Sequence, residues 1–222
     1  MSVLRLAAPV GLAFLPLGMA LGLLVVHAGL AWWWAPVFAA VIYAGSLEFL
    51  MVGLAATGAP VATAALTALI VNSRHVFYAL SFPLHRVRGV PGKIYSTYVL
   101  SDEAYAVAVS PVAEHWTGRQ ILTVQAALHL TWTVSAAGGG LLGVALPLER
   151  LHGLEFALTA LFIVLAIDAY RQHPDPLTAV AAVLCAVAAW MLVPGQMLVW
   201  AFAAFTVLLL ARFLIRPGRA DA

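Results

Sequence analysis

Long apolar stretches separated by short polar turns run through the whole 222-residue chain. We distinguish eight of them, at residues 8–27, 34–55, 61–83, 95–113, 120–146, 154–169, 177–193 and 197–215. Several approach or exceed the roughly 20 apolar residues that an α-helix needs to cross a bilayer. The pattern therefore predicts an all-α polytopic membrane protein in which residues 1–222 form a single transmembrane domain.

One polar run, Asn72-Ser73-Arg74-His75, interrupts the third segment, which carries no other charge between residues 61 and 83. Moving one arginine to the centre of a membrane helix costs about 2.5–3.5 kcal/mol on insertion scales, so such a run is expected to face a bundle interior or a wet cavity. We interpret 61–83 as a re-entrant or broken helix that turns at 72–75, with its polar tip in a transport path. The alternative is a short span that ends with Arg74 at the membrane interface.

Composition supports the membrane assignment. Hydrophobic residues make up 64% of the chain and charged residues 9%, against about 25% charged residues in soluble domains. The formal net charge of +2 reflects basic loops and does not indicate a nucleic-acid partner. The single cysteine, Cys185, cannot form an internal disulfide and gives no information about the compartment.

The basic residues favour a topology with re-entrant segments, because loops on the cytoplasmic side are enriched in lysine and arginine. If all eight segments cross, six basic residues lie inside and four outside. If 61–83 is re-entrant and one late segment, such as 177–193, does not cross, only Arg119 and Arg171 lie outside. The inside then holds eight basic residues: Arg5, Arg86, Arg88, Lys93, Arg150, Arg212, Arg216 and Arg219.

This topology of six spanning and two re-entrant segments predicts an inverted repeat of halves 1–113 and 114–222, because each half has an odd number of crossings. The first segment of each half holds a GxxxG pair, Gly18 with Gly22 and Gly139 with Gly143. Such pairs permit close helix contact and offer faces for association with another chain. A second echo joins residues 46–49 to residues 153–156, where Leu-Glu-Phe recurs.

Three carboxylates stand out at membrane depth, Glu48 in the second segment and Asp102 and Glu103 in the fourth. Carboxylates in such positions must pair, take up a proton or face water. Arg74 is the cation that we expect to pair with Glu48 or Asp102. For Asp102 and Glu103 a surface turn is the alternative, because Ser101 before them resembles a helix N-cap.

Other polar residues extend this candidate site. Gly45 and Ser46 could open a helix and expose backbone amides to an anionic group. His129 is expected to be a core histidine bonded to a neighbour, and Asp168 an interfacial end cap. Helical spacing places on shared faces Asn72 with His75, and Tyr98 with Asp102 and Tyr105.

The residues resemble the AzlC family, the large subunits of branched-chain amino acid exporters or permeases. The resemblance rests on Pro9-x-Gly11-x-x-Phe14-x-Pro16-x-Gly18, Tyr43-Ala44-Gly45-Ser46-x-Glu48-Phe49, Asn72-Ser73-Arg74-His75-x-x-Tyr78 and Asp102-Glu103. It implies export of hydrophobic amino acids across the bacterial inner (plasma) membrane. It also implies a small membrane partner subunit of the AzlD type. The chain departs from the family at Glu48, where glutamine is usual.

The expected substrate and ion site consists of Gly45, Ser46, Glu48, Asn72, Arg74, His75, Tyr78, Asp102 and Glu103. Arg74 with open helix amides would hold the carboxylate of an amino acid, and Glu48 or Asp102 would hold its ammonium group or a coupling proton. The alternatives are an ion or small-solute channel, and a carrier of another zwitterion or anion. We expect no enzyme, cofactor or metal site, because GxSxG and HExxH patterns are absent and the histidines are scattered.

Overall fold

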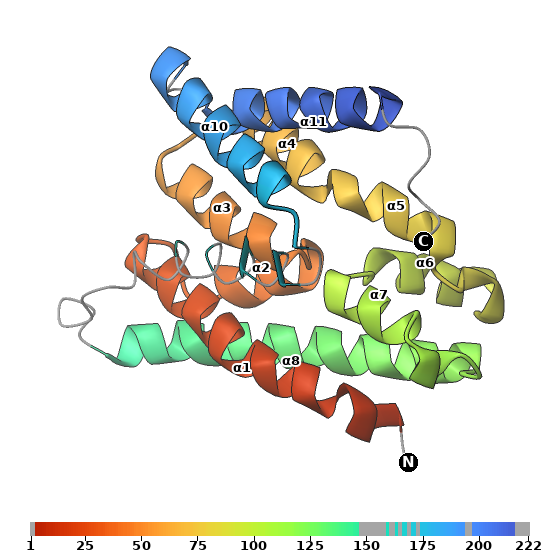
Figure 1. The fold of residues 1–222 in the computed structure, drawn as a ribbon. Coiled ribbons are helices and arrows are strands. Elements are labelled where there is room, and N and C mark those ends of the chain that lie inside the picture. Colours follow the sequence, from red (N-terminus) through yellow and green to blue (C-terminus); the bar gives the residue numbers. More distant parts are fainter. Residues whose placement is uncertain are drawn as a thin grey trace.

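A computed structural model describes residues 3–146, 174–193 and 197–215, together with positions 159, 163, 166–167 and 170–171. Within these residues the chain is helical and has no strand, so the predicted all-α class is confirmed there (Figure 1). The helices are α1 (Val3–His27), α2 (Trp34–Val41), α3 (Gly45–Ala56), α4 (Val61–Val71), η1 (Asn72–Arg74), α5 (His75–Ser81), η2 (Leu84–Arg86), α6 (Val90–Tyr98), α7 (Asp102–Ala108), η3 (Pro111–Ala113), α8 (Gly118–Ala145), α10 (Pro176–Leu192) and α11 (Met197–Ile215).

Helices α1 and α8 form the base of the molecule and cross at close range (Figure 1). Both predicted GxxxG pairs lie in this crossing and face each other. A Cβ atom on Gly22 would overlap the backbone of Ala136, and one on Gly139 would overlap the backbone of Met19. The two backbones can approach this closely only because glycine has no side chain. The predicted close helix contact is therefore confirmed. The glycine faces are buried between α1 and α8 of the same chain, so they do not offer a surface for association with another chain.

The segment 34–55 is a hairpin of two half-length helices rather than one predicted span. Helix α2 runs antiparallel to α8. Trp32, just before α2, lies beside Gly140, whereas the carbonyl of Ala40 near the end of α2 is hydrogen-bonded to His129, which comes earlier in α8. The chain reverses at Tyr43, whose φ of 45° lies in the left-handed region that bulky residues rarely enter. Helix α3 then returns to the end where α2 began, so this hairpin reaches only the middle of the molecule.

The segment 61–83 does not turn back at residues 72–75, so the prediction that it is re-entrant is wrong. A single 3-10 turn, Asn72–Arg74, joins α4 to α5, and the two helices continue in one direction (Figure 1). No glycine or proline interrupts the run, and Ser73 keeps the helical path by donating to the carbonyl of Ile70 at 2.8 Å. Residues 61–81 span about 33 Å at 1.5–2.0 Å per residue, which matches the thickness of a bilayer core.

The segment 95–113 forms a second hairpin, which enters from the opposite end. Helix α6 runs parallel to α8, with Gly92 beside Leu122 and Ser96 bonded to Gln125. Helix α7 returns to the same end, where Arg86 donates to the carbonyl of Ala113 at 2.9 Å. Because the helix breaks at residues 99–101, the continuous face predicted for positions 98, 102 and 105 does not form.

Ser101 is the N-cap of α7, as its sequence suggested, and its hydroxyl accepts from the amide of Ala104 at 3.2 Å. Ser101 is nevertheless buried, so the alternative of a surface turn is wrong. The cap starts a new helix inside the molecule, where the extended residues before it have no regular helical bonds. Because Ser101 starts a helix here, Asp102 and Glu103, which follow it, lie at the tip of the hairpin.

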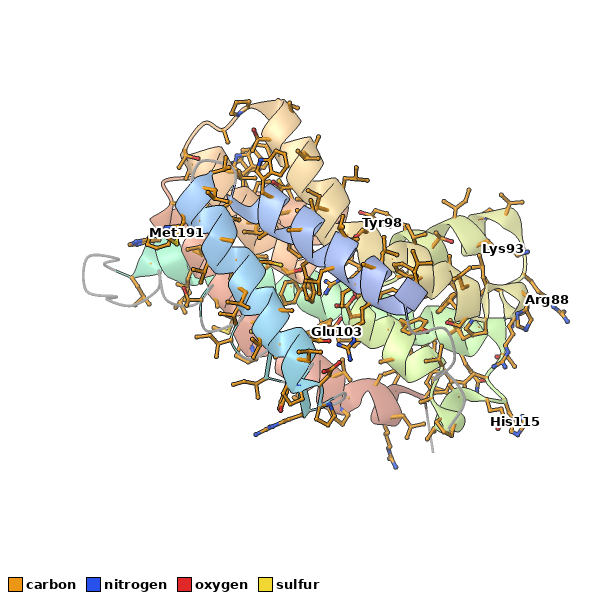
Figure 2. The ribbon with its side chains drawn as sticks, turned by 45° about the horizontal axis from the view of Figure 1, so that its top comes forward. Arg88, Lys93, Tyr98, Glu103, His115 and Met191 are labelled. Carbon is orange, nitrogen blue, oxygen red and sulfur yellow. The ribbon has the colours of Figure 1, made fainter. Side chains whose placement is uncertain are left out.

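One end of the molecule collects the basic loops. Arg88 and Lys93 lie there together with His115 (Figure 2). The starts of α1 and α8 lie at the same end, because these two helices run in the same direction. The basic residues of this end, which we call the basic end, are Arg5, Arg86, Arg88, Lys93 and Arg119. Arg119 was predicted on the opposite side, and it changes place because the chain between α5 and α8 folds as a hairpin that does not cross.

Beyond α8, the structure describes mainly α10 and α11, which pack antiparallel. Arg212 near the end of α11 bonds Asp175 at 2.7 Å and Thr178 at 2.6 Å, at the start of α10. Asp168, Arg150 and nearly all of segment 154–169 lie outside the described residues, so the inverted repeat of halves 1–113 and 114–222 stays a prediction. Among the described helices, α1 has the length and composition to cross a membrane, with a mean hydropathy of 2.2.

Candidate functional site

Three interruptions of helical structure meet at one pocket in the middle of the molecule. They are the tip of the α2–α3 hairpin, the 3-10 turn at the centre of α4 and α5, and the tip of the α6–α7 hairpin. Helices α1 and α8 close the remaining wall. The lining residues are Phe14, Leu17, Tyr43, Ala44, Gly45, Ser46, Arg74, His75, Ser101, Asp102, Glu103 and Trp132. Broken helices bring free backbone groups and charges to the middle of a membrane protein, where substrates bind in many transporters.

Arg74 and Asp102 form the charged centre of the pocket. Their Nη1 and Oδ2 atoms are 2.8 Å apart, and both side chains keep about a third of their surface exposed, at 39% and 34%. The structure thereby decides between the two predicted partners, because Arg74 pairs with Asp102 and not with Glu48. Its Nη2 also donates to the Ser46 hydroxyl at 3.2 Å, whereas its buried Nε has no hydrogen-bond partner within the described residues.

Asp102 gathers further donors from the turn between α4 and α5. The Tyr78 hydroxyl donates to its Oδ1 at 2.8 Å, and Nε2 of His75 lies 3.8 Å from the same oxygen. Tyr78 is in turn stacked on Tyr105, with ring centroids 4.4 Å apart. These contacts fix one face of the carboxylate, while its other surface faces the pocket.

Glu48 lies directly behind the pocket and is fully buried, with 0% of its surface exposed. Its carboxylate accepts from the indole Nε1 of Trp132 at 2.9 and 3.1 Å and from the amide of Ala44 at 2.8 Å. Within the described residues no ion pair reaches it. Both donors are neutral, so a glutamine oxygen could accept the same bonds. The family's usual residue therefore fits this environment.

Several polar groups of the pocket lack a complete set of partners among the described residues. Glu103 lines the pocket and makes no ion pair with the described part of the chain; Figure 2 places it in the middle of the molecule, far from Arg88 and Lys93. The buried hydroxyl of Tyr43 and the Nε of Arg74 have no hydrogen-bond partner there. Buried polar groups are nearly always satisfied, and a polar ligand in the pocket would give the Nε of Arg74 an acceptor and Glu103 a counter-charge.

The structure brings together most of the predicted site. Gly45, Ser46, Arg74, His75, Asp102 and Glu103 line the pocket, and Tyr78 and Glu48 contact it from behind. Asn72 is not among the lining residues, and its buried Oδ1 has no hydrogen-bond partner among the described residues. His129 is bonded to two neighbours, the carbonyl of Ala40 and the hydroxyl of Tyr95, each at 3.2 Å, as expected of a core histidine.

Sequence reasoning missed other lining residues as parts of a site, chiefly Tyr43, Ser101 and Trp132. Tryptophans in membrane proteins are typically interface anchors, but Trp132 is 5% exposed and sits at mid-depth. The sequence offered only a weak indication that Trp132 belongs to the site. A tryptophan near the centre of a long apolar segment needs an acceptor for its indole N–H, and a buried carboxylate elsewhere in the chain was available as that acceptor.

The geometry agrees with the comparison with known protein families. The model of the AzlC protein family matches residues 9–146, a stretch that contains every pocket-lining residue. The chain belongs to the AzlC family. The resemblance found in the sequence is thereby confirmed, and the match ends where α8 ends.

Individual relatives agree with this assignment. The branched-chain amino acid transport protein AzlC of Bacillus subtilis is 29% identical over 191 residues, covering 85% of this chain and 74% of the relative. An uncharacterized membrane protein of Haemophilus influenzae is 32% identical, covering 71% and 65%. The inner membrane protein YgaZ of Escherichia coli is 27% identical, covering 81% and 76%. No solved structure matches the chain. The relatives of this AzlC-family chain are thus named as membrane proteins or, in the case of the Bacillus subtilis protein, for branched-chain amino acid transport.

Proposed function

We propose that this AzlC-family chain exports branched-chain or other hydrophobic amino acids from the bacterial cytoplasm across the inner membrane, as one component of a carrier. The observation that carries the proposal is the Arg74–Asp102 pair at the meeting point of three helix breaks. An exposed ion pair at the centre of an apolar molecule is costly. A zwitterionic substrate, which also carries one positive and one negative group, explains why both charges face a pocket.

The carboxylate of the substrate is assigned to Arg74 and the start of α3. The buried Nε of Arg74 is a donor without a partner in the described chain. The first amides of α3, at Gly45 and Ser46, have no acceptor inside their own helix, and the positive end of the helix dipole lies there. An anion placed between these groups receives charge-assisted hydrogen bonds from two sides.

The ammonium group is assigned to Glu103, with Asp102 beside it. Glu103 lines the pocket and has no cation partner among the described residues. Asp102 is already engaged by Arg74 at 2.8 Å, so it can orient an ammonium group but offers less free charge. A bound ammonium would supply Glu103 with the counter-charge that a carboxylate needs at membrane depth.

The hydrophobic side chain of the substrate is assigned to the wall of α1 and α8. Phe14, Leu17 and Trp132 line this wall, and Phe14 packs edge-on against Trp132 with ring centroids 5.3 Å apart. The pocket encloses about 90 Å³, several times the 10–15 Å³ that one water molecule needs. This volume suits a small organic solute better than a bare ion and favours a carrier over an ion channel.

Proton coupling is assigned to Glu48, because only neutral donors surround it. A carboxyl group in such surroundings can change its charge without breaking an ion pair. Asp102 is less suited, because taking up a proton would leave Arg74 unmatched. We therefore expect Glu48→Gln to retain transport, while the transport rate no longer changes with pH through the protonation of residue 48.

A small AzlD-type membrane subunit is the partner that the family resemblance suggests. The outer face of α4 and α5 is a candidate surface, because large apolar side chains are exposed along its whole length. They are Leu69, Val76, Phe77 and Leu80, each at least 68% exposed. Lipid would cover this face in the absence of a subunit.

The test is efflux and counterflow of labelled leucine in proteoliposomes, with and without the small subunit. We expect flux that saturates and accelerates with leucine on the opposite side, largest when both subunits are present. Arg74→Ala should abolish it, whereas Arg88→Ala, at the basic end and away from the pocket (Figure 2), should not. Flux that rises linearly without counterflow would support a channel, and full activity of Arg74→Ala would remove this pocket from the transport path.

A further inference from the structure

The two hairpin tips carry the same six-residue pattern. Tyr43, Ser46 and Glu48 at the first tip correspond to Tyr98, Ser101 and Glu103 at the second, so that both read Tyr-x-x-Ser-x-Glu. Each pair is separated by 55 residues, as positions 43 and 98 or 48 and 103 show. Residues of both copies line one pocket, so the pattern recurs both in sequence and in its position at the pocket.

The same offset of 55 residues aligns the surrounding helices. It places α1, Val3–His27, over residues 58–82, which hold α4, η1 and α5. It places α2, Trp34–Val41, over 89–96, where α6 lies, and the start of α3 close to the start of α7. Residues 3–56 and 58–111 therefore each contain one full-length helical element followed by one half-length hairpin.

The two units point in opposite directions. Helix α2 runs antiparallel to α8 and α6 runs parallel to it, and the hairpins enter from opposite ends of the molecule (Figure 1). His129 of α8 contacts both units at equivalent positions. Its Nε2 donates to the carbonyl of Ala40, so its Nδ1 accepts from the hydroxyl of Tyr95, both at 3.2 Å. Positions 40 and 95 are again 55 residues apart.

The equivalent tips nevertheless differ in conformation. Tyr43 is held at a φ of 45°, whereas Tyr98 is the last residue of α6. Glu48 is fully buried against Trp132, whereas Glu103 faces the pocket. Two units that share this tip pattern and run in opposite directions, but differ in conformation, are what a second state would require in which each unit takes the conformation of the other.

We propose that residues 3–56 and 58–111 form an inverted repeat around His129, and that their tips exchange conformations to open the pocket to either side of the membrane. In the exchanged state Glu103 is buried and Glu48 faces the pocket, while His129 keeps its bonds to both hairpins as a pivot. The repeat is smaller than the halves 1–113 and 114–222. The inference rests on the proposed transport function for its purpose, although its geometry is independent of the substrate.

The test compares Glu48→Gln with Glu103→Gln. Glutamine accepts the same bonds as a buried glutamate but has no charge to desolvate, so each substitution favours the state in which its own position is buried. The reporter is a cysteine at Leu17, which lines the pocket, in a Cys185→Ala background. An impermeant thiol reagent is added to right-side-out and to inside-out vesicles, and the ratio of the two labelling rates is measured.

We expect the two substitutions to shift this ratio in opposite directions and the double variant to lie between them. Glu114→Gln, in an exposed loop at the basic end, is the matched control and should leave the ratio unchanged. Shifts in the same direction, or no shift, would overturn the exchange. A second reporter at Phe14 repeats the measurement if the Leu17 variant does not fold. Because labelling needs no substrate, opposite shifts in a protein that does not carry leucine would contradict the proposed function alone.

His129 gives a separate readout of the pivot. His129→Gln retains one donor and one acceptor, so the labelling ratio should still respond to Glu48→Gln and Glu103→Gln. His129→Leu removes both bonds, and the ratio should no longer respond. An unchanged response in His129→Leu would overturn the role of His129 as pivot.

Discussion

The hydrogen bonds that hold Glu48 give the sharpest prediction about the site. Trp132→Phe removes the indole N–H, which donates to both carboxylate oxygens at 2.9 and 3.1 Å, and keeps an aromatic ring beside Phe14. Glu48 is then left with one donor, the amide of Ala44. Because the carboxylate is 0% exposed, no water replaces the lost bond without a rearrangement of the core.

The magnitude depends on the charge of Glu48. A hydrogen bond to a charged group contributes about 1.5–3 kcal/mol, and one between neutral groups about 1 kcal/mol. Trp132→Phe should therefore lower the free energy of unfolding by about 1.5–3 kcal/mol when Glu48 is ionised, beyond the cost of the smaller ring. In a Glu48→Gln background the same substitution should cost only about 1 kcal/mol for the lost bond.

The assay is a double-mutant cycle of unfolding free energies in detergent micelles. Trp116→Phe is the matched control, because Trp116 is also buried, at 8% exposed, and its indole makes no hydrogen bond within the described residues. Subtracting its cost removes the effect of ring size. The free energy of unfolding lost in Trp132→Phe is compared with that lost in Trp116→Phe, in the unmodified chain and in the Glu48→Gln background. If the two losses are equal in both, the hydrogen bond from Trp132 to Glu48 does not stabilise the protein.

Three further predictions concern the scaffold. Gly139→Val should separate α1 from α8 and lower the melting temperature, whereas Gly138→Val, which meets nothing within 4 Å, should not; equal melting temperatures would contradict the close crossing. In a cysteine-free background, the cysteine of Arg88→Cys should be shielded from an external impermeant thiol reagent, whereas the cysteine of Thr57→Cys should be labelled. The reverse pattern would show that the basic end faces the outside. The hydrogen bond from Thr178 and the ion pair with Arg212 lower the pKa of Asp175 to about 2. The unmodified chain should therefore be more stable than Asp175→Asn, by a free-energy difference that is at its full size above about pH 4. This difference should disappear as the pH falls through about 2. An unfolding curve of Asp175→Asn that parallels the unmodified chain at every pH would contradict this assignment.

Much of the site could be predicted because charge in an apolar segment is costly and therefore conspicuous. Arg74, Asp102 and Glu103 were singled out on this ground alone, and the structure brings all three to one pocket. The choice between Glu48 and Asp102 as the partner of Arg74 required tertiary structure, since both acids are remote from it in sequence. Trp132 escaped notice because tryptophan is common at membrane interfaces.

The hairpins could not be predicted from hydropathy. Two half-length helices that turn back have the same apolar length as one helix that crosses, so 34–55 and 95–113 were interpreted as spans. The polar run at 72–75 suggested a turn, but its residues are compatible with helical dihedrals and form a 3-10 turn. The true reversal at Tyr43 depends on a left-handed residue, for which tyrosine gives no warning.

The proposed function depends on Arg74, which we expect to bind the carboxylate of an amino acid in this pocket. The most direct test measures binding of leucine and of leucinamide, which lacks the carboxylate, to the unmodified chain and to Arg74→Ala. We expect the unmodified chain to bind leucine more tightly than leucinamide, and Arg74→Ala to lose this preference, because the positive charge that binds the carboxylate is gone. An Arg74→Ala protein that still prefers leucine by the same factor would contradict this expectation.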